Sequence, residues 1–272
     1  MKKLIRYIKF YLGVYFLKFV SFFLSKIKFY ILPNFSKEYL SKILYSKVNK
    51  SFYYSKTNNK FDVIKIDASN LKSELCKIGE KFNCEKSPYS NRAWHRHPYT
   101  GIYDIFFYKY RNKVFNFAEI GIGPRSTGLR MFREYFKKAR IFGFELKKAN
   151  IKFAKKLKLK KSYYYNIDVR DSKNIYKAFS KTKRKFEIIV DDSNHYFPNQ
   201  INIIKNCADF LLPNGILVIE DIFIKKNVEL EFIKHLGNSL KKFNKVIFVD
   251  CNHINKYSKH WNNDKLCILI KS

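Results

Sequence analysis

The stretch FNFAEIGIGPRSTGLRMFREYFKKARIFGFE, residues 115–145, decides the fold of this chain. It begins with an apolar run that ends at a glycine-rich turn, continues with a helix-length segment and ends with a second apolar run. Strand-like runs separated by helix-length segments are typical of βαβ units, in which the two strands are parallel. The stretch therefore predicts the first such unit of an α/β domain.

The same alternation continues to the C-terminal end. Strand-like runs occupy residues 115–121, 140–145, 163–168, 186–192, 215–221, 245–250 and 265–270. Helix-length segments lie around residues 129–138, 147–159, 172–183, 198–211 and 228–242. The last two runs are separated by a polar stretch without helical periodicity, which favours an antiparallel end to the sheet. We therefore predict an α/β fold with a Rossmann-like, doubly wound sheet that is mostly parallel and has an antiparallel last strand.

The composition indicates a globular chain with an extreme charge. The 272 residues are 46% hydrophobic and carry a formal net charge of +33, which would suit nucleic acid or an anionic membrane as partner. The abundance of Lys, Asn, Ile, Phe and Tyr is also typical of an AT-rich genome, and we favour drift and solubility as the origin of most of the charge. The five scattered cysteines are odd in number and show no metal-site spacing, which predicts a reducing, cytoplasmic compartment.

The N-terminal residues 1–33 differ from the rest of the chain. They contain no acidic residue, and basic side chains interrupt their aromatic and aliphatic runs. The longest nearly apolar stretch, Phe10 to Ser25, is broken by Lys18 and is short for a membrane span of roughly 20 residues. We expect a helix lying on the anionic inner face of the membrane, or one packed on the α/β domain or a partner. The predicted domains are a basic aromatic extension, residues 1–60, and an α/β domain, residues 61–272.

Ligands of open α/β sheets bind beyond the carboxyl ends of the strands. The first strand ends with Glu119, Gly121 and Gly123, where glycine lets the backbone approach a ligand closely. A dinucleotide fingerprint would need glycine where Ser126 stands, which disfavours a nicotinamide cofactor.

Acidic residues also end the next two strands. Glu145 is placed to accept hydrogen bonds from two ribose hydroxyls, and Asp168 ends the third strand. A helix cap or a solvated strand end is the alternative for each of them taken singly.

The stretch FEIIVDDSNHYFPNQ, residues 186–200, places Asp191, Asp192 and His195 after a buried strand. The following strand ends with Glu220 and Asp221, and neighbouring strands would bring these carboxylates together. Such a cluster persists only if a cation or a proton neutralises it, and oxygen ligands suit Mg²⁺. His195 would then be a general base, with the metal lowering the pKa of a bound substrate hydroxyl. A polar turn is the simpler alternative.

These residues resemble a known family. EIGIG at 119–123, FEIIVDDSNHYFPNQ at 186–200 and LLPNGILVIEDI at 211–222 resemble class I S-adenosylmethionine-dependent methyltransferases. More narrowly, they are similar to metal-dependent sugar O-methyltransferases of antibiotic biosynthesis and bacterial surface-glycan clusters. NCEKSPYSNRAWHRHPYTGIYDIFF, residues 83–107, resembles the segment that covers the cofactor in these relatives. The similarity spans roughly residues 75–250.

The resemblance implies a seven-stranded sheet, S-adenosylmethionine on the glycine turn and a divalent cation. The implied cofactor-binding residues are Glu119, Gly121, Gly123, Glu145 at the ribose, Asp168 near the adenine, Tyr99 and Tyr103 near the methionine end, and Asp191 in a supporting role. The implied metal ligands are Asp192, Glu220 and Asp221, and the implied base is His195. Two positions depart from the family pattern: Ser193 replaces a glycine, and Glu85-Lys86 replaces an Asp-Lys pair.

The sequence thus predicts a Mg²⁺-dependent O-methyltransferase acting on a hydroxyl of a sugar or other small polyol. An RNA-binding or RNA-modifying methyltransferase is the alternative suggested by the charge, but no RNP-like signature is present, and we expect no nucleic-acid partner. A membrane-attached binding protein without catalysis is a third hypothesis. His253, His260 and Trp261 are candidates for an acceptor pocket, with surface-loop residues as the alternative.

Overall fold

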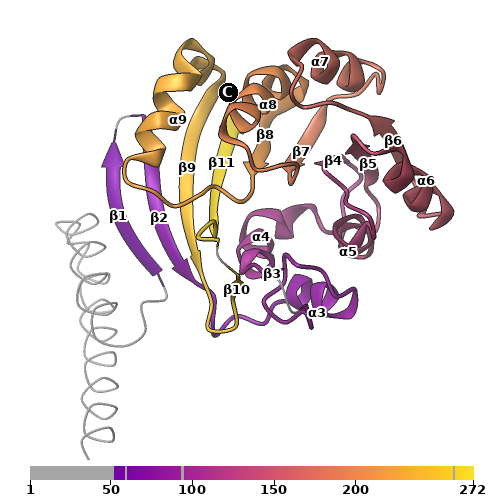
Figure 1. Ribbon diagram of the computed structural model, residues 1–272, viewed down its shortest axis with the longest axis horizontal. Coiled ribbons are helices and arrows are strands. Elements are labelled where there is room, and N and C mark those ends of the chain that lie inside the picture. Colours follow the sequence, from indigo (N-terminus) through magenta and orange to yellow (C-terminus); the bar gives the residue numbers. More distant parts are fainter. Residues whose placement is uncertain (1–51, 59, 93–94, 260) are drawn as a thin grey trace, which may run out of the picture. The chain divides into compact units, whose positions relative to one another are not determined.

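The computed structural model describes residues 52–58, 60–92, 95–259 and 261–272 (Figure 1). The chain divides into two compact units, Met1–Tyr54 and Ser55–Ser272. The helix and the membrane contact predicted for residues 1–33 lie outside the described residues and stay predictions, as does the domain boundary at residue 60. Within the described part of the chain, no helix is both long and apolar enough to cross a membrane.

One large sheet forms the centre of the second unit. Its strands follow the order β1-β2-β9-β11-β8-β7-β4-β5-β6. Their bounds are Phe52–Asn58 (β1), Phe61–Asp67 (β2), Asn116–Ile120 (β4), Arg140–Glu145 (β5), Ser162–Asn166 (β6), Phe186–Asp191 (β7), Leu211–Ile219 (β8), Phe243–Asn252 (β9) and Lys265–Lys271 (β11). Strand β11 runs antiparallel to both β8 and β9, and the pairs from β7 to β6 are parallel.

The seven predicted strands are all present, and the antiparallel last strand is confirmed. Two further strands extend the sheet to nine, with β2 pairing in parallel with β9. The run FDVIKID of β2 has its polar residues at Asp62, Lys65 and Asp67, which is neither a continuous apolar run nor a strict alternation. Its place in the sheet therefore depends on a pairing with a strand about 180 residues later, which local patterning does not reveal.

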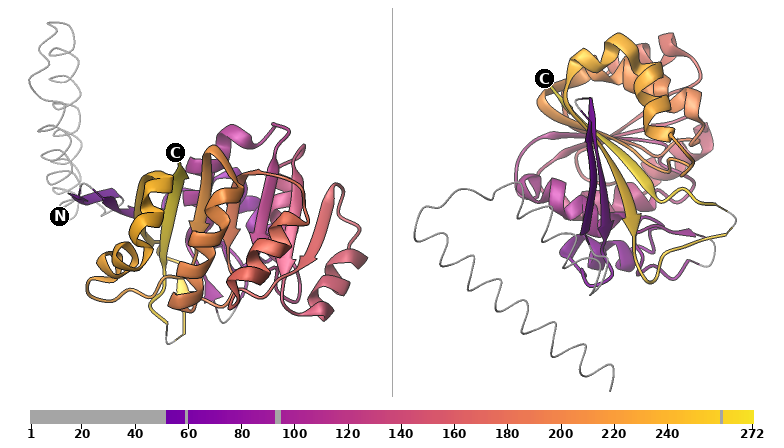
Figure 2. Two further views of the ribbon diagram at one scale, coloured as in Figure 1. Left: turned by 90° about the horizontal axis from the view of Figure 1, so that it is seen from above. Right: turned by 90° about the vertical axis from the view of Figure 1, so that its left-hand side faces the viewer.

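Helices cover both faces of the sheet (Figure 2). They are α3 (Glu74–Lys81), α4 (Tyr99–Phe107), α5 (Thr127–Tyr135), α6 (Lys148–Lys156), α7 (Ser172–Ser180), α8 (Phe197–Cys207) and α9 (Val228–Leu236), with short 3₁₀ turns η1 (Tyr108–Tyr110), η2 (Ala208–Phe210) and η3 (Gly237–Lys242). Helices α7, α8 and α9 pack on one face, and α3 to α6 pack on the other. All five helical segments expected after residue 128 are present.

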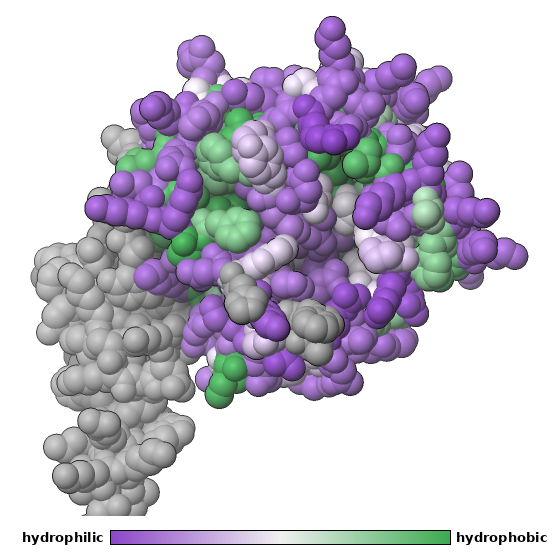
Figure 3. Space-filling model, viewed as in Figure 1, coloured by the Kyte–Doolittle hydropathy of each residue, from purple (hydrophilic) through white to green (hydrophobic). Residues whose placement is uncertain are grey.

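The core consists of two apolar layers, one on each side of the sheet. In β4, Phe117 contributes to the α3–α6 layer, whereas Ala118 and Ile120 contribute to the layer under α7–α9. All five cysteines are buried and form no disulfide. Cys207 and Cys267 are small core residues, as their apolar sequence surroundings predict. The coloured part of the face shown in Figure 3 is mainly hydrophilic, with small groups of apolar side chains.

Two features of this fold position the site. Strand β4 leads through α5 to β5 on one side, and its other neighbour, β7, leads through α8 to β8 on the opposite side, so the two connections diverge and open a crevice at the carboxyl ends of β4 and β7. In addition, β3 (His95–Arg96) and β10 (Tyr257–Ser258) form a small antiparallel sheet. This pairing brings the segment before α4 next to the loop between β9 and β11.

Candidate active site

The turn after β4 can accept only glycine at its first position. Gly121 has a φ of +86°, and a Cβ there would lie 2.0 Å from the carbonyl oxygen of Asp192. Gly128, at the start of α5, is also crowded, because a Cβ there would lie 2.3 Å from the side-chain atom Oε1 of Glu119. Gly123 has a φ of +63° but open space around it. The turn therefore presents bare backbone towards the crevice, as the sequence predicted.

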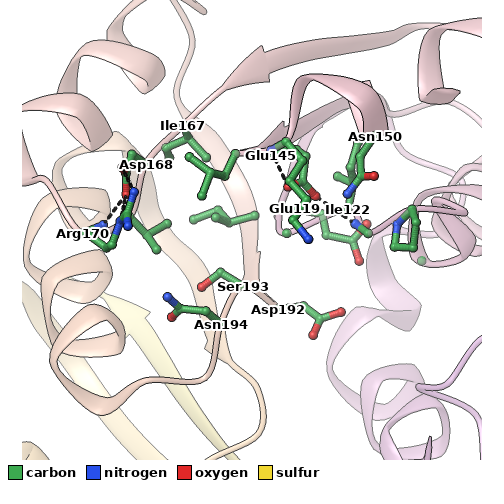
Figure 4. Close-up of a pocket in the computed structure, with 18 of the residues that line it drawn as sticks. Glu119, Ile122, Glu145, Asn150, Ile167, Asp168, Arg170, Asp192, Ser193 and Asn194 are labelled. Carbon is green, nitrogen blue, oxygen red and sulfur yellow. Dashed lines mark hydrogen bonds and ion pairs between the residues drawn. The ribbon is translucent and has the colours of Figure 1, made fainter. Parts of the chain in front are cut away.

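A cavity of about 380 Å³ opens beside this turn (Figure 4). Its walls include Glu119, Gly121, Gly123, Glu145, Asp168 and Asp192 from the predicted site, together with Ile122, Asn150, Ile167, Arg170, Ser193 and Asn194. Figure 4 shows Glu119 and Glu145 on one side of the cavity, Asp168 and Arg170 on another, and Asp192 to Asn194 below them. Six predicted residues thus share one cavity.

Glu145 holds the glycine turn in place. Its Oε2 accepts a hydrogen bond from the backbone N–H of Gly123 at 3.1 Å, and its Oε1 accepts one from Lys147 at 2.9 Å. A carboxylate has about four acceptor positions, so it can still accept bonds from hydroxyls of a ligand. The ribose contact predicted for Glu145 is compatible with this arrangement.

Asp168 is paired with Arg170 at the rim of the cavity. The guanidinium donates to both carboxylate oxygens, with distances of 2.9 and 2.6 Å. Hydrogen bonding from Arg170 lowers the pKa of Asp168, which therefore stays ionised.

Glu119 lies buried at the base of the cavity with one oxygen unused. Its Oε2 has no hydrogen-bond partner among the described residues, and its Oε1 is 3.6 Å from the Lys86 ammonium. Burial raises the pKa of Glu119 to about 8, although Lys86 opposes this shift. An unsatisfied buried carboxyl that lines a cavity is a ready partner for a cationic or hydrogen-bond-donating ligand.

Asp192, His195 and Asp221 form a cluster that could hold a metal ion, since one ligand atom from each lies within 4.8 Å of the others. His195 Nε2 lies 3.4 Å from Asp221 Oδ2 and 3.9 Å from Asp192 Oδ1. His195 and Asp221 both have a φ of +56°, a backbone conformation that non-glycine residues adopt at a cost. Two carboxylates and an imidazole suit a hard or borderline divalent cation.

Lys86 neutralises the buried side of this cluster. Its ammonium is fully buried, contacts Asp192 Oδ2 and lies 2.7 Å from Glu220 Oε2. Burial alone would lower the pKa of Lys86, but Asp192, Glu220 and Glu119 together raise it well above its ordinary value, so this side chain is a cation. The sequence reading noted Lys86 as part of a departure from the family pattern and gave it no role.

Glu220 makes its hydrogen bonds to residues outside the three-residue cluster. Besides its contact with Lys86, its Oε1 accepts a hydrogen bond from the Tyr103 hydroxyl at 2.5 Å. Both of its oxygens are therefore engaged by the protein, whereas Asp192 and Asp221 each direct one oxygen towards His195. The prediction that Glu220 is a metal ligand is not tested by this arrangement.

His97 and Tyr99, which lie just before and at the start of α4, contact Asp221. The Tyr99 hydroxyl donates to Asp221 Oδ1 at 2.5 Å, and His97 Nδ1 lies 3.6 Å from the same oxygen and 2.9 Å from Asp264 Oδ1. Burial alone would raise the pKa of Asp221, but His97 and His195 lower it below its usual range. Tyr99 and Tyr103 are fully buried, and neither lines the cavity beside the glycine turn.

Asp191 supports the loop that carries Asp192. It is buried, accepts a hydrogen bond from the Ser193 backbone N–H at 3.2 Å and does not line the cavity. Burial raises the pKa of Asp191 to about 7. Ser193, which replaces the family's glycine, is not among the described residues with a left-handed backbone, so the loop accommodates a side chain there.

Sequence reasoning missed Lys86, His97 and Asp264 as parts of the site. Tyr99 and Tyr103 stand one helical turn apart on α4, which places both hydroxyls on the same face. A buried lysine and an imidazole in a loop carry no comparable pattern, and their roles depend on contacts more than 100 residues away in the sequence.

Comparison with known proteins identifies the family to which this fold belongs. The methyltransferase-domain family matches residues 115–266. A curated relative, the 8-demethyl-8-alpha-L-rhamnosyl tetracenomycin-C 2'-O-methyltransferase of Streptomyces olivaceus, is 24% identical over 137 residues, which make up 47% of this chain and 34% of that protein.

Among solved structures, MycE from the mycinamycin biosynthetic pathway, in complex with Mg and SAH, has a TM-score of 0.53 and 18% identity and covers 74% of this chain. MycE with Mg, SAH and mycinamycin VI gives a TM-score of 0.53 and 17% identity. This chain spans 34% of the length of the curated relative and 55% of MycE. These structures share the fold, and because the family match covers more than half of the sequence, the chain belongs to the methyltransferase-domain family.

Proposed function

We propose that this protein is an S-adenosylmethionine-dependent O-methyltransferase that uses Mg²⁺ or a similar cation to methylate a hydroxyl of a sugar or other small polyol. The observation that carries the proposal is the position of Asp192. This residue lines the cavity beside the glycine turn and also belongs to the cluster with His195 and Asp221. A methyl donor in the cavity and an acceptor hydroxyl at the cluster would therefore meet at one residue.

The cavity has features that suit S-adenosylmethionine. Glu119 offers an unpaired carboxylate oxygen for the cationic methionine end, Gly121 leaves the backbone bare, and Glu145 and Asp168 offer acceptors for the nucleoside end. The volume of about 380 Å³ lies within the range of small-molecule sites. When bound, the cofactor supplies an electrophilic methyl group and the cation supplies positive charge beside the acceptor.

The protein's own residues would orient the acceptor and remove its proton. Asp192 and Asp221 would hold the cation. His195, whose Nε2 faces both carboxylates, would take the hydroxyl proton. Lys86 and Tyr103 would hold Glu220 in place beside these residues. Much of the rate enhancement would come from the alignment of the methyl donor with the acceptor hydroxyl.

The names of the relatives support a sugar as the acceptor. The curated relative is a 2'-O-methyltransferase of a rhamnosyl compound, and MycE was solved with Mg and mycinamycin VI. Since the chain spans only part of each of these proteins, the sugar acceptor is a proposal for this chain. The carboxylates of the cluster also disfavour the phosphates of RNA, the alternative suggested by the +33 charge.

Methyl transfer to small acceptors, with RNA as a parallel arm, tests this function. Mass spectrometry should detect a 14 Da increase on a glycoside or polyol that depends on S-adenosylmethionine and on added Mg²⁺. Asp192→Ala and His195→Ala should abolish transfer, while calorimetry should show cofactor binding within about threefold of wild type. His235→Ala, which removes an exposed imidazole on α9, is the matched control and should keep full activity. Full activity in both site variants, or methylation of RNA alone, would contradict the proposal.

The membrane contact of residues 1–33 remains part of the proposal. It is supported by the absence of acidic residues and by the early basic side chains of that segment. The protein should sediment with vesicles that contain anionic lipid, and binding should fall steeply with salt. Replacing Lys2, Lys3, Arg6 and Lys9 by Gln should reduce the bound fraction. Equal binding to neutral and anionic vesicles would argue against it.

A further inference from the structure

Three aromatic side chains that neither line the cavity nor belong to the Asp192–His195–Asp221 cluster gather at the surface. Trp261 and Phe223 are 46% and 44% exposed, and His95 is partly exposed. The Trp261 ring centroid lies 5.1 Å from that of His95 and 6.0 Å from that of Phe223. They come from three segments that are far apart in the sequence. We call His95, Phe223 and Trp261 the aromatic platform.

The platform is connected to the Asp192–His195–Asp221 cluster. Phe223 follows Asp221 by two residues. From the other side, the His95 ring stacks on His97 at 5.8 Å, His97 stacks on Tyr99 at 5.0 Å, and the Tyr99 hydroxyl donates to Asp221. The cavity beside the glycine turn reaches the same cluster through Asp192 and contains none of the platform residues. The cluster is therefore connected both to the cavity and to the aromatic platform.

Backbone hydrogen bonds fix the platform in place. The N–H of Ile224 donates to the carbonyl of Asn262 at 2.7 Å, which ties the segment of Phe223 to the loop of Trp261. The N–H of Ile222 donates to Lys265 at 3.0 Å. His95 belongs to β3, which pairs with β10, and its Nδ1 lies 3.0 Å from the Ser258 hydroxyl. A surface ordered before binding loses little conformational entropy when a ligand arrives.

We propose that the aromatic platform binds the pyranose ring of the acceptor, with one C–H face of the sugar on Trp261 and Phe223 and a hydroxyl at the Asp192–His195–Asp221 cluster. This rests on the proposed methyltransferase function and names the surface that recognises its acceptor. Exposed aromatic rings bury the apolar face of a ligand, while a few polar groups set its orientation. A pyranose combines an apolar face with hydroxyls at its edge. The platform offers the first kind of contact and the cluster offers the second.

Three substitutions test the platform through substrate affinity. Trp261→Ala and Phe223→Ala should raise KM for the glycoside acceptor roughly tenfold or more and leave kcat within about threefold, because loss of a central aromatic contact weakens binding. Trp261→Phe keeps an aromatic face and should retain KM within about threefold. Tyr176→Ala removes an exposed aromatic side chain on α7 that packs against Phe210, and it should leave KM unchanged.

A direct binding readout separates recognition from turnover. Saturation-transfer NMR with methyl α-L-rhamnopyranoside, methyl α-D-glucopyranoside and catechol should show saturation on C–H protons of one glycoside face. The signal should be lost in Trp261→Ala and kept in Tyr176→Ala. It should also persist in His195→Ala, a variant in which the proposed chemistry is absent.

The outcomes distinguish the two proposals. If His195→Ala is inactive but Trp261→Ala and Phe223→Ala keep the wild-type KM, the platform is overturned and the function stands. If neither glycoside gives a signal with the wild-type protein, or if only catechol does, the pyranose platform is overturned. Thermal unfolding of each variant checks that these surface substitutions leave the fold intact.

Discussion

The two halves of the crevice are built on different principles. On the β4–β5–β6 side, backbone N–H groups and the glycine turn form an open cavity, and Glu145 acts by accepting bonds from that backbone. On the β7–β8 side, charged side chains pack against one another, with Lys86 buried between carboxylates. The first half therefore depends on the space around its backbone, and the second on the balance of its charges. Substitutions should affect the two halves in different ways.

The largest effect is expected at Gly121. Gly121→Ala would place a Cβ 2.0 Å from the Asp192 carbonyl at a φ of +86°, so the turn and the loop after β7 would both have to move. We expect a loss of at least about 3 kcal/mol in unfolding free energy and cofactor binding too weak for calorimetry. Gly123→Ala has open space and should cost only about 1 kcal/mol for its positive φ. Similar losses of stability and of cofactor binding in the two variants would contradict the view that the cavity side depends on the close approach of the Gly121 backbone to Asp192.

The second half is tested by removing its internal cation. Lys86→Met leaves Asp192, Glu220 and Glu119 without their partner and should cost roughly 3–5 kcal/mol, as expected when one member of a buried charge group is lost. Added Mg²⁺ should restore part of the lost stability, because it supplies positive charge to the same carboxylates. Lys81→Met removes an exposed lysine paired with Glu134 and should change stability by less than about 1 kcal/mol. Denaturant unfolding with and without Mg²⁺ measures both, and a fully stable Lys86→Met protein would contradict the charge balance.

The same contrast explains how much the sequence revealed. The strands, the helices after residue 128 and the glycine turn follow from local patterns, because each of these elements carries its own periodicity and turn residues. Asp192, His195 and Asp221 could be brought together because parallel strand ends meet at one edge of the sheet.

Lys86 and His97 could not be placed in the same way. Their hydrogen-bond partners Asp192, Glu220 and Asp264 lie more than 100 residues later in the sequence, and only the packed fold brings them together. Glu220 and Asp221 also differ in their contacts: Lys86 and Tyr103 bind Glu220, whereas Asp221 faces His195. Two adjacent acidic residues in a sequence do not reveal such a difference.

A pH-dependent effect is expected where the two halves meet, at Glu119. Because burial raises its pKa to about 8, the folded protein holds a proton that the unfolded chain releases near pH 4.5. The resulting stabilisation is present at low pH and is lost as the pH rises through about 8. Between pH 6 and pH 9 this group alone should lower the unfolding free energy of the metal-free protein by about 2–3 kcal/mol. Glu119→Gln should remove that part of the pH dependence in denaturant titrations with EDTA, and an unchanged slope would exclude Glu119 as its source.

The smallest effect on stability, and the sharpest test of the cavity side, is expected at Asp168. Its ion pair with Arg170 is largely exposed, and such pairs contribute little, so Asp168→Asn and Arg170→Ala should each change the unfolding free energy by less than about 0.5 kcal/mol. If Asp168 contacts the nucleoside end of the cofactor, its loss should still weaken S-adenosylmethionine binding about threefold to tenfold, because a typical hydrogen bond contributes about 0.5–1.5 kcal/mol net. Arg170→Ala frees the carboxylate without removing it and should weaken binding less than Asp168→Asn. Calorimetry at fixed ionic strength measures these affinities. Equal affinities in both variants and in the wild type would show that Asp168 only pairs with Arg170 and does not bind the cofactor. Cofactor recognition on this side would then depend on Glu145 and the glycine turn.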